Sequence, residues 1–345
     1  MRVMSSSELI ARVASAWRGL SEERAIATFS EQWKTGGRLV VSDSEFLPHR
    51  EGCPDQVQNA LQEDVVRIVD GDWACLHGHV LKVSMPPDWH CDYLAEQSFW
   101  EDCPARRLNH RALPRGGDVR LIWEVNRWLP LVRLGQAAYL FGDGASARLV
   151  VALLDDWAIR NPVGRGLNWT SAMESGIRLI NLRWIHALMS EAALTDDERI
   201  RFESRVRELA LSHAWWVSRH LSVGSSANNH LLGELAGLLV ALEAWPELAK
   251  WTLPIGALAE RFEDEVLRQF LADGGNCEQA MHYHLFAFEL CWHAVSALRR
   301  EKIVLRDEVI DRLGAAAGFL ARVAHPGEPW DYGDSDDAQV VPLTQ

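Results

Sequence analysis

The sequence predicts a mainly α-helical protein. From about residue 118 onward, apolar residues recur at spacings of three and four, the pattern of a helix with a buried face. Clusters of Gly, Pro, Asn and Asp interrupt this pattern and mark the turns between helices. Several helical stretches are apolar on more than one face, which indicates helices packed on both sides.

The first 110 residues differ from the rest of the chain. Residues 1–36 predict one or two helices. Residues 37–110 are rich in Pro, Gly, Asp and Cys and contain two short β-like pieces, VVRIVDG at 65–71 and HVLKVSM at 79–85. We therefore expect residues 1–110 to form N-terminal helices and an irregular segment with short strands, packed on a larger helical domain.

Residues 111–325 are expected to form that larger domain. Its predicted helices lie in seven main segments: 123–141, 171–194, 196–221, 228–245, 258–271, 278–300 and 308–324. So many successive antiparallel helices favour an incomplete α/α toroid, or partial barrel, over a four-helix bundle. Residues 326–345 are acidic and turn-rich, and we expect them to begin a linker to a further, β-rich domain.

Composition and charge exclude several classes of protein. The formal net charge of −13 argues against a general nucleic-acid binder, although a cleft can be locally positive on an acidic body. The sequence has no apolar run long enough to span a membrane and no signal-peptide pattern at its start. We expect a cytoplasmic location, or a periplasmic one if a targeting segment was removed. The six cysteines form no CxxC pair and are expected to be free thiols; in an exported protein the four N-terminal ones could pair.

Four segments together resemble the heparinase II/III-type polysaccharide lyases. They are DVRLIWEVNRW at 118–128, NPVGRGLNWTSAMESGIRLINLRW at 161–184, SSANNHLLGELAGLL at 225–239, and DGGNCEQAMHYHLFAFEL at 273–290, the last followed by YGDSDD at 332–337. The resemblance extends over roughly residues 64–340. It implies an N-terminal α/α toroid, whose β-sandwich partner domains are absent from this chain. It also implies β-elimination at uronic acids of a polysaccharide.

Asn229 and His230 suit the first requirement of that reaction. Removing the C5 proton of a uronate requires hydrogen-bond donors that neutralise its carboxylate. Both residues follow a loop and open an apolar helix, where free N–H groups and the helix dipole favour an anion. The dipole should also lower the pKa of His230. The alternative is an N-capping Asn228 or Asn229 and a first-turn surface histidine.

Tyr283 suits the roles of acid and base. It follows His230 by 53 residues, close to the separation that the resemblance implies for the catalytic tyrosine. Asn276 and Gln279 resemble a capping box, which would place Tyr283 in the second turn of a helix. The phenol would need nearby donors to act as a base. The alternative is a half-buried core tyrosine.

Further residues are candidates for substrate binding, each with a structural alternative. Arg127 could hold a uronate or sulfate, or pair with a helix neighbour. Trp169 could stack on a sugar, although most of the sixteen tryptophans should fill the core. Glu174 and Arg178 could pair with each other at their i,i+4 spacing, and Glu234 could orient the ring of His230. The complete set is Asn126, Arg127, Asn168, Trp169, Glu174, Arg178, Glu234, Glu278, His284 and Asp334.

No cofactor is expected to be required, and we assign no metal ligands. The acidic group Asp334, Asp336 and Asp337 invites a calcium interpretation, but its spacing does not complete an EF-hand loop. The expected partner is an anionic uronate polysaccharide or oligosaccharide, with no nucleic acid and no membrane. Family members often take a further His or Tyr from the β-rich half, so this chain alone is expected to be weakly active or inactive.

Two alternative functions remain open at this stage. An α/α toroid also hosts glycoside hydrolases, which need two carboxylates across a cleft. Glu174, Glu234 and Glu278 are available for that purpose. The other alternative is a non-catalytic polysaccharide-binding helical domain.

Overall fold

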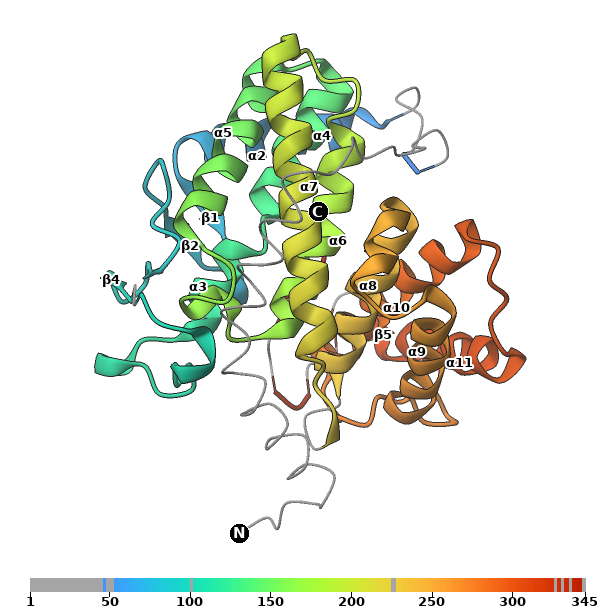
Figure 1. The fold of residues 1–345 in the computed structure, drawn as a ribbon. Helices are drawn as coiled ribbons and strands as arrows, with labels where there is room; N and C mark the ends of the chain where they lie inside the picture. The colour runs from blue at the N-terminus through green and yellow to red at the C-terminus, as the bar shows by residue number, and fades with distance from the viewer. Residues whose placement is uncertain are drawn as a thin grey trace.

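A computed structural model describes residues 46–47, 53–99, 102–224, 228–325, 328–329, 332–334 and 337–342. Helices dominate this part of the chain, and the strands are short and form two-stranded sheets only (Figure 1). The predicted mainly α class is therefore confirmed. The helices expected over residues 1–36 lie outside the described residues.

The N-terminal portion contains one helix and two small hairpins. Helix α2 (Asp55–Val69) leads into β1 (Asp72–Ala74), which pairs antiparallel with β2 (Val80–Lys82). Strand β3 (Cys91–Asp92) pairs with β4 (Gln97–Ser98). The β-like piece at 79–85 does contain a strand, β2, but a strand at 65–71 was a wrong prediction, because these residues complete α2. Leu61 and Ile68, seven residues apart, are buried on one face of that helix, so tertiary packing overrides the β-branched composition.

The larger helical portion follows without interruption by a sheet. Its helices are α3 (Val119–Asn126), α4 (Leu129–Phe141), α5 (Gly144–Arg160), α6 (Ala172–Leu188), α7 (Asp196–Arg219), α8 (Asn229–Ala244), α9 (Ile255–Gln269), α10 (Met281–Arg300) and α11 (Asp307–Val323). A last hairpin joins β5 (Ala324–His325) to β6 (Glu328–Pro329). The segment 123–141, expected as one helix, is two. Trp128 breaks it with a φ of 66°, and Pro130 restarts it, because proline fits only the first turn of a helix.

The helices form two layers of antiparallel neighbours. One layer runs from α4 through α6 and α8 to α10, and α5, α7, α9 and α11 pack on its outer side. In Figure 1, α4 to α7 group together, and α8 brings α9, α10 and α11 alongside them. Helices α6 and α8 are buried over almost their whole length, as expected for helices packed on both sides.

Glycines allow α6 and α8 to approach closely. A Cβ atom on Gly237 would lie 2.5 Å from both the Cα and the carbonyl oxygen of Gly176. A Cβ on Gly176 would lie 2.4 Å from the carbonyl oxygen of Gly233. The two helix backbones are therefore in direct contact, and this contact fixes the start of α8 relative to α6.

The segment 337–342 packs back on the helical layers instead of leaving them. The backbone N–H groups of Val340 and Val341 donate to Glu289 of α10 at 3.0 and 2.9 Å. Asn181 of α6 donates to the carbonyl of Val340 at 2.8 Å, and Gln136 of α4 donates to that of Pro342 at 3.1 Å. The described end of the chain thus crosses α4, α6 and α10.

Two further features concern membrane-spanning helices and the cysteines. Within the described ranges, no helix is both long enough and apolar enough to cross a bilayer. Each of the six cysteines carries a free thiol.

Candidate active site

The start of α8 is held by an acid from the loop before α10. Glu278 accepts from the side-chain amide of Asn228 at 3.1 Å and from the backbone N–H of Asn229 at 3.2 Å. Asn228 occupies the N-cap position, but its side chain makes no capping hydrogen bond. The simple N-cap alternative therefore does not describe this site. Asn229 is 7% exposed, and its Oδ1 atom has no hydrogen-bond partner among the described residues.

His230 is half-buried in the first turn of α8. Burial lowers its pKa, the carboxylate of Glu174 opposes this change, and Arg111 and Arg127 add to it. The expected direction is therefore correct, but the main cause is burial rather than the helix dipole. A neutral imidazole at pH 7 can donate one hydrogen bond to an anion from its single ring N–H.

Arg127 and Glu174 form a buried ion pair next to His230. Arg127 donates from Nε and Nη2 to the two carboxylate oxygens of Glu174 at 2.9 and 2.8 Å, and from Nη1 to Glu124 at 2.7 Å. Burial alone would raise the pKa of Glu174, but the charge and hydrogen bonds of Arg127, with the charge of Arg178, lower it overall. The hydrogen bonds of Glu174 thus go to Arg127, not to Arg178 at i+4.

Tyr283 lies in the first turn of α10, half-buried. The expected capping box is wrong. Helix α10 begins at Met281, and Asn276 accepts instead from the backbone N–H of Glu278 at 2.9 Å. Gln279 adopts a φ of 54°, so these residues form a turn. Glu278, five residues before Tyr283, bonds the start of α8. Phe286, three residues after Tyr283, lies 5.7 Å from the Arg127 guanidinium.

A cavity of about 650 Å³ opens beside this region and carries a cationic lining. No Asp or Glu belongs to its described lining. The walls include four arginines and three histidines: Arg106, Arg111, Arg219, Arg261, His110, His220 and His230. Asn228, Trp123, Trp169 and Trp216 also line it. We call it the cationic pocket. The expectation of a locally positive cleft on an acidic protein is met here.

Three candidate residues form a buried network behind the pocket, and a fourth, Trp169, packs on this network and also lines the pocket. Asn126 donates to the carbonyls of Trp89 and Ile122, and Asn168 donates to Trp89 and Asn161. Arg178 donates from Nε to His213 at 2.9 Å, and burial lowers its pKa to about 9. Trp169 is 1% exposed and packs against Trp157, His213 and Trp216. These positions suit support of the pocket rather than direct contact with a polymer.

Three further candidates occupy other positions. Glu234 is fully buried and bonds Ser222, so it is neither a surface residue nor a hydrogen-bonding partner of His230. His284 is buried between Phe270 and Phe319, on the side of α10 that faces α11. Asp334 is exposed and lies close enough to Glu278 to raise its pKa further, after burial.

The sequence did not single out the pocket arginines. Arg106, Arg111, Arg219 and Arg261 come from loops and from two helices that are distant in sequence. Among the described residues, neither Arg111 nor Arg261 has a carboxylate within ion-pair distance. Their only signal in the sequence is a basic residue near the end of a helix or in a polar loop, which is too common to be informative.

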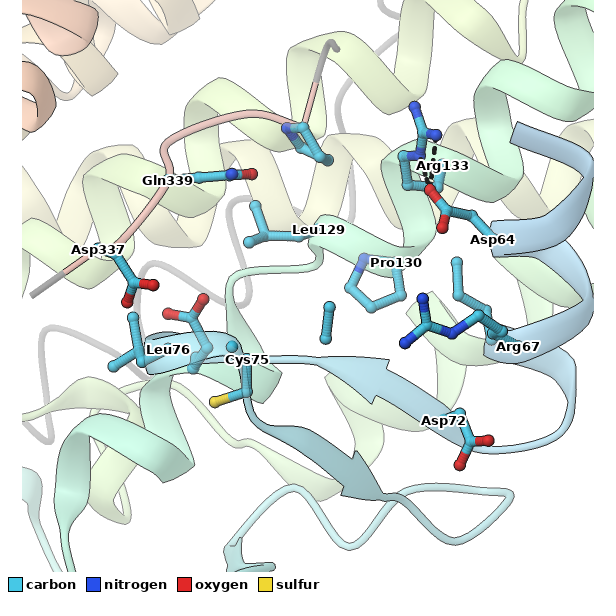
Figure 2. Close-up of a pocket in the computed structure, with 15 residues that line it drawn as sticks. Asp64, Arg67, Asp72, Cys75, Leu76, Leu129, Pro130, Arg133, Asp337 and Gln339 are labelled. Carbon is cyan, nitrogen blue, oxygen red and sulfur yellow. Dashed lines mark hydrogen bonds and ion pairs between the residues drawn. The ribbon is translucent and has the colours of Figure 1, made fainter. Parts of the chain in front are cut away.

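A second cavity, of about 320 Å³, lies between α2, β1, the start of α4 and the segment 337–342 (Figure 2). Its lining mixes acids and arginines, and Asp64 is paired with Arg133 at 2.6 Å. Burial raises the pKa of the Cys75 thiol to about 12, so this thiol stays protonated. This mixed lining favours neither an anionic nor a cationic ligand. Within the described residues no group of three or more His, Cys, Asp or Glu side chains could hold a metal ion.

Comparison with known proteins identifies the family of this chain. The family profile described as "Heparinase II/III N-terminus" matches residues 92–326, more than half of the chain. The chain belongs to this family. No curated protein is significantly similar in sequence.

Solved structures show the same fold at low sequence identity. A heparan sulfate lyase, HepC, from Pedobacter heparinus is 16% identical with a TM-score of 0.53, and 93% of this chain covers 47% of it. A crystal structure of heparinase III is 15% identical with a TM-score of 0.57, and 91% of this chain covers 45% of it. The chain therefore spans less than half the length of these structures.

Proposed function

We propose that this protein is a polysaccharide lyase that cleaves uronic-acid-containing polysaccharides by β-elimination. The cationic pocket is the observation that carries the proposal. It gathers four arginines and three histidines without a carboxylate in the described lining, in a protein whose net charge is −13. Such a lining attracts a polyanion, because guanidinium groups form charge-assisted hydrogen bonds with carboxylates and sulfates.

The first step is neutralisation of the uronate carboxylate. Asn229 and the neutral imidazole of His230 donate to it, which makes the proton on C5 acidic enough to remove. The buried pair Arg127–Glu174 supports this step, because its two charges act on the pKa of His230: Arg127 lowers it and Glu174 raises it. A hydrogen bond to the developing enolate strengthens as negative charge accumulates there.

The second step transfers protons. Tyr283 protonates the leaving oxygen as the bond from C4 breaks. The C5 proton goes either to Tyr283 itself, which must then start the reaction as a phenolate, or to a second base. The product carries a double bond between C4 and C5. The chain spans less than half of the related structures, so we expect a further acid or base from elsewhere in the whole protein and weak turnover by this chain alone.

The hydrogen bonds of the three candidate acids count against the hydrolase alternative. Of the proposed lyase residues, His230 lines the cationic pocket, whereas Asn229 and Tyr283 do not belong to its described lining. A glycosidase requires two carboxylates facing its substrate. Glu174 is held by Arg127, Glu234 by Ser222, and Glu278 by the start of α8. None of the three belongs to the described lining of the cationic pocket.

The test combines catalysis with binding. The protein is incubated with heparan sulfate, heparin, alginate and a bacterial uronate exopolysaccharide, and the ultraviolet absorbance of an unsaturated product is followed. Tyr283→Phe should remove this absorbance while retaining oligosaccharide binding in calorimetry, whereas Tyr139→Phe, a matched change on α4, should keep both. New reducing ends without absorbance would mean hydrolysis. Binding without either product would mean a carbohydrate-binding domain.

A further inference from the structure

A buried carboxyl group ties α8 to the chain that follows α7. Glu234 of α8 accepts from the backbone N–H of Ser222 at its Oε2 atom, and it bonds the Ser222 hydroxyl at its Oε1 atom, both at 2.6 Å. Leu221, Ser222 and Val223 all line the cationic pocket. One side chain therefore joins the helix that carries His230 to a wall of the pocket beside it.

The tie supplies the only hydrogen bond described for the backbone of this segment, whose Leu221 side chain also packs on the hydrophobic core. Among the described residues, the backbone of 221–224 makes no other hydrogen bond, and Val223 is exposed. Glu234, in contrast, is fully buried within α8, one of the most buried helices of the fold. The rigid partner is thus the helix, and the wall of the pocket takes its position from it.

The carboxyl group suits this role in its neutral form. Burial raises the pKa of Glu234 to about 8, although both hydrogen bonds from Ser222 oppose the change. A carboxylate accepts both bonds from Ser222. A protonated carboxyl still accepts the N–H at one oxygen, and its own O–H donates to the serine oxygen, which reverses the second bond. A glutamine amide offers the same pair of functions, an oxygen acceptor and an N–H donor, in nearly the same shape.

We propose that Glu234 is a positioning residue that fixes the Leu221–Val223 wall of the cationic pocket relative to His230. Its effect on polysaccharide binding rests on the proposed function, whereas its effect on the wall does not. Glu234 acts through Ser222 and not on the substrate, since it does not belong to the described lining.

Two variants at one position test the tie directly. Amide hydrogen exchange is measured in the protein without ligand. In Glu234→Leu, the Ser222 amide should exchange about tenfold faster or more, because its hydrogen bond to Glu234 is lost. Glu234→Gln should restore protection close to that of the wild type. Ser222→Ala, which keeps the backbone bond and removes the hydroxyl, should give an intermediate rate and serves if Glu234→Leu does not fold.

The same variants report on the pocket. Calorimetry with a heparan sulfate oligosaccharide should show weaker binding, by about tenfold, in Glu234→Leu, with recovery in Glu234→Gln. Unchanged exchange of the amide at position 222 in both Glu234→Leu and Ser222→Ala would overturn the proposal. So would faster exchange that spreads equally through α8. Faster exchange at position 222 without any oligosaccharide binding by the wild type would keep the tie and refute the proposed function instead.

Discussion

Arg127 and Glu174 are joined by two parallel hydrogen bonds of 2.9 and 2.8 Å, and neither side chain is solvated. A third bond from the same guanidinium reaches Glu124 on its own helix. The pair connects α3 to α6 and acts electrostatically on His230 at the start of α8. Three helices of the candidate site therefore depend on one guanidinium group.

Removing that guanidinium should strongly destabilise the protein. Arg127→Met removes the guanidinium that holds both oxygens of the fully buried Glu174 carboxylate, and such losses cost about 3–5 kcal/mol. The free energy of unfolding is measured by urea titration at pH 7. Arg127→Met combined with Glu174→Leu should recover part of the loss, because the unpaired charge at position 174 is then absent.

The matched control is an ion pair of the same type at the surface. Arg160 bonds Asp156 at 2.9 Å one turn away, and half of the Arg160 side chain is exposed. Arg160→Met should cost less than about 1 kcal/mol. Equal effects of Arg127→Met and Arg160→Met would show that the Arg127 pair is not buried in solution.

The pocket arginines should control the affinity for anionic oligosaccharides. Arg111→Ala and Arg261→Ala each remove a cation from the described lining without breaking an ion pair among the described residues. Each should weaken binding of a heparan sulfate oligosaccharide by about tenfold or more, and should reduce the dependence of affinity on salt. Calorimetry at two salt concentrations measures both effects.

Arg322→Ala is the comparison for these two variants. Arg322 is an exposed arginine near the end of α11 and does not line the pocket. The Arg322→Ala variant should bind the heparan sulfate oligosaccharide as tightly as the wild type does. If Arg322→Ala weakened binding as much as Arg111→Ala, attraction to the protein surface in general, not the pocket, would explain the affinity.

Much of the fold could be predicted because helix packing leaves a regular record in the sequence. Apolar spacing located the helices from α6 to α11 within a few residues. Local signals were less reliable. The β-branched run at 65–69 belongs to a helix, and Asn276 with Gln279 forms a turn instead of a cap. In both places contacts distant in sequence decided the conformation.

The candidate site was only partly predictable for a related reason. Asn229, His230 and Tyr283 could be singled out, because helix starts and a rare residue type are visible in a sequence. The cationic pocket could not, since Arg111 and Arg261 are 150 residues apart and meet only in the folded chain. The role of Glu234 was missed because its partner, Ser222, lies in a loop with no pattern of its own.

The glycine contact between α6 and α8 predicts an unusual response to alanine. Glycine to alanine within a helix usually stabilises by about 0.5–1 kcal/mol. In Gly237→Ala the new methyl group would lie 2.5 Å from the backbone of Gly176, so the helices must separate. We expect a loss of about 1–3 kcal/mol in the free energy of unfolding. Gly314→Ala on α11 is the control, because its Cβ would meet open space, and it should be neutral or stabilising. A stabilised Gly237→Ala would contradict the close contact.

Buried His293 should make the stability depend on pH in acid. Burial, with a smaller contribution from Arg300, lowers its pKa from 6.5 to about 4. Below pH 6.5 the unfolded chain therefore binds a proton that the folded protein excludes. Stability should fall as the pH decreases from about 6.5 to about 4, by about 3 kcal/mol in total, and this contribution should level off below that range.

Replacement of the imidazole isolates this contribution from that of the carboxylates. Glu289 lies 3.9 Å from His293 and accepts from the backbone N–H groups of Val340 and Val341, so this acid stays in place when the histidine is changed. In His293→Gln, urea unfolding at pH 7 and pH 5 should give a smaller difference in stability than in the wild type, whatever the absolute cost of the substitution. His79→Gln, at an exposed histidine in the N-terminal hairpin, should leave the difference unchanged. A wild-type slope in His293→Gln would mean that this histidine is protonated in the folded protein.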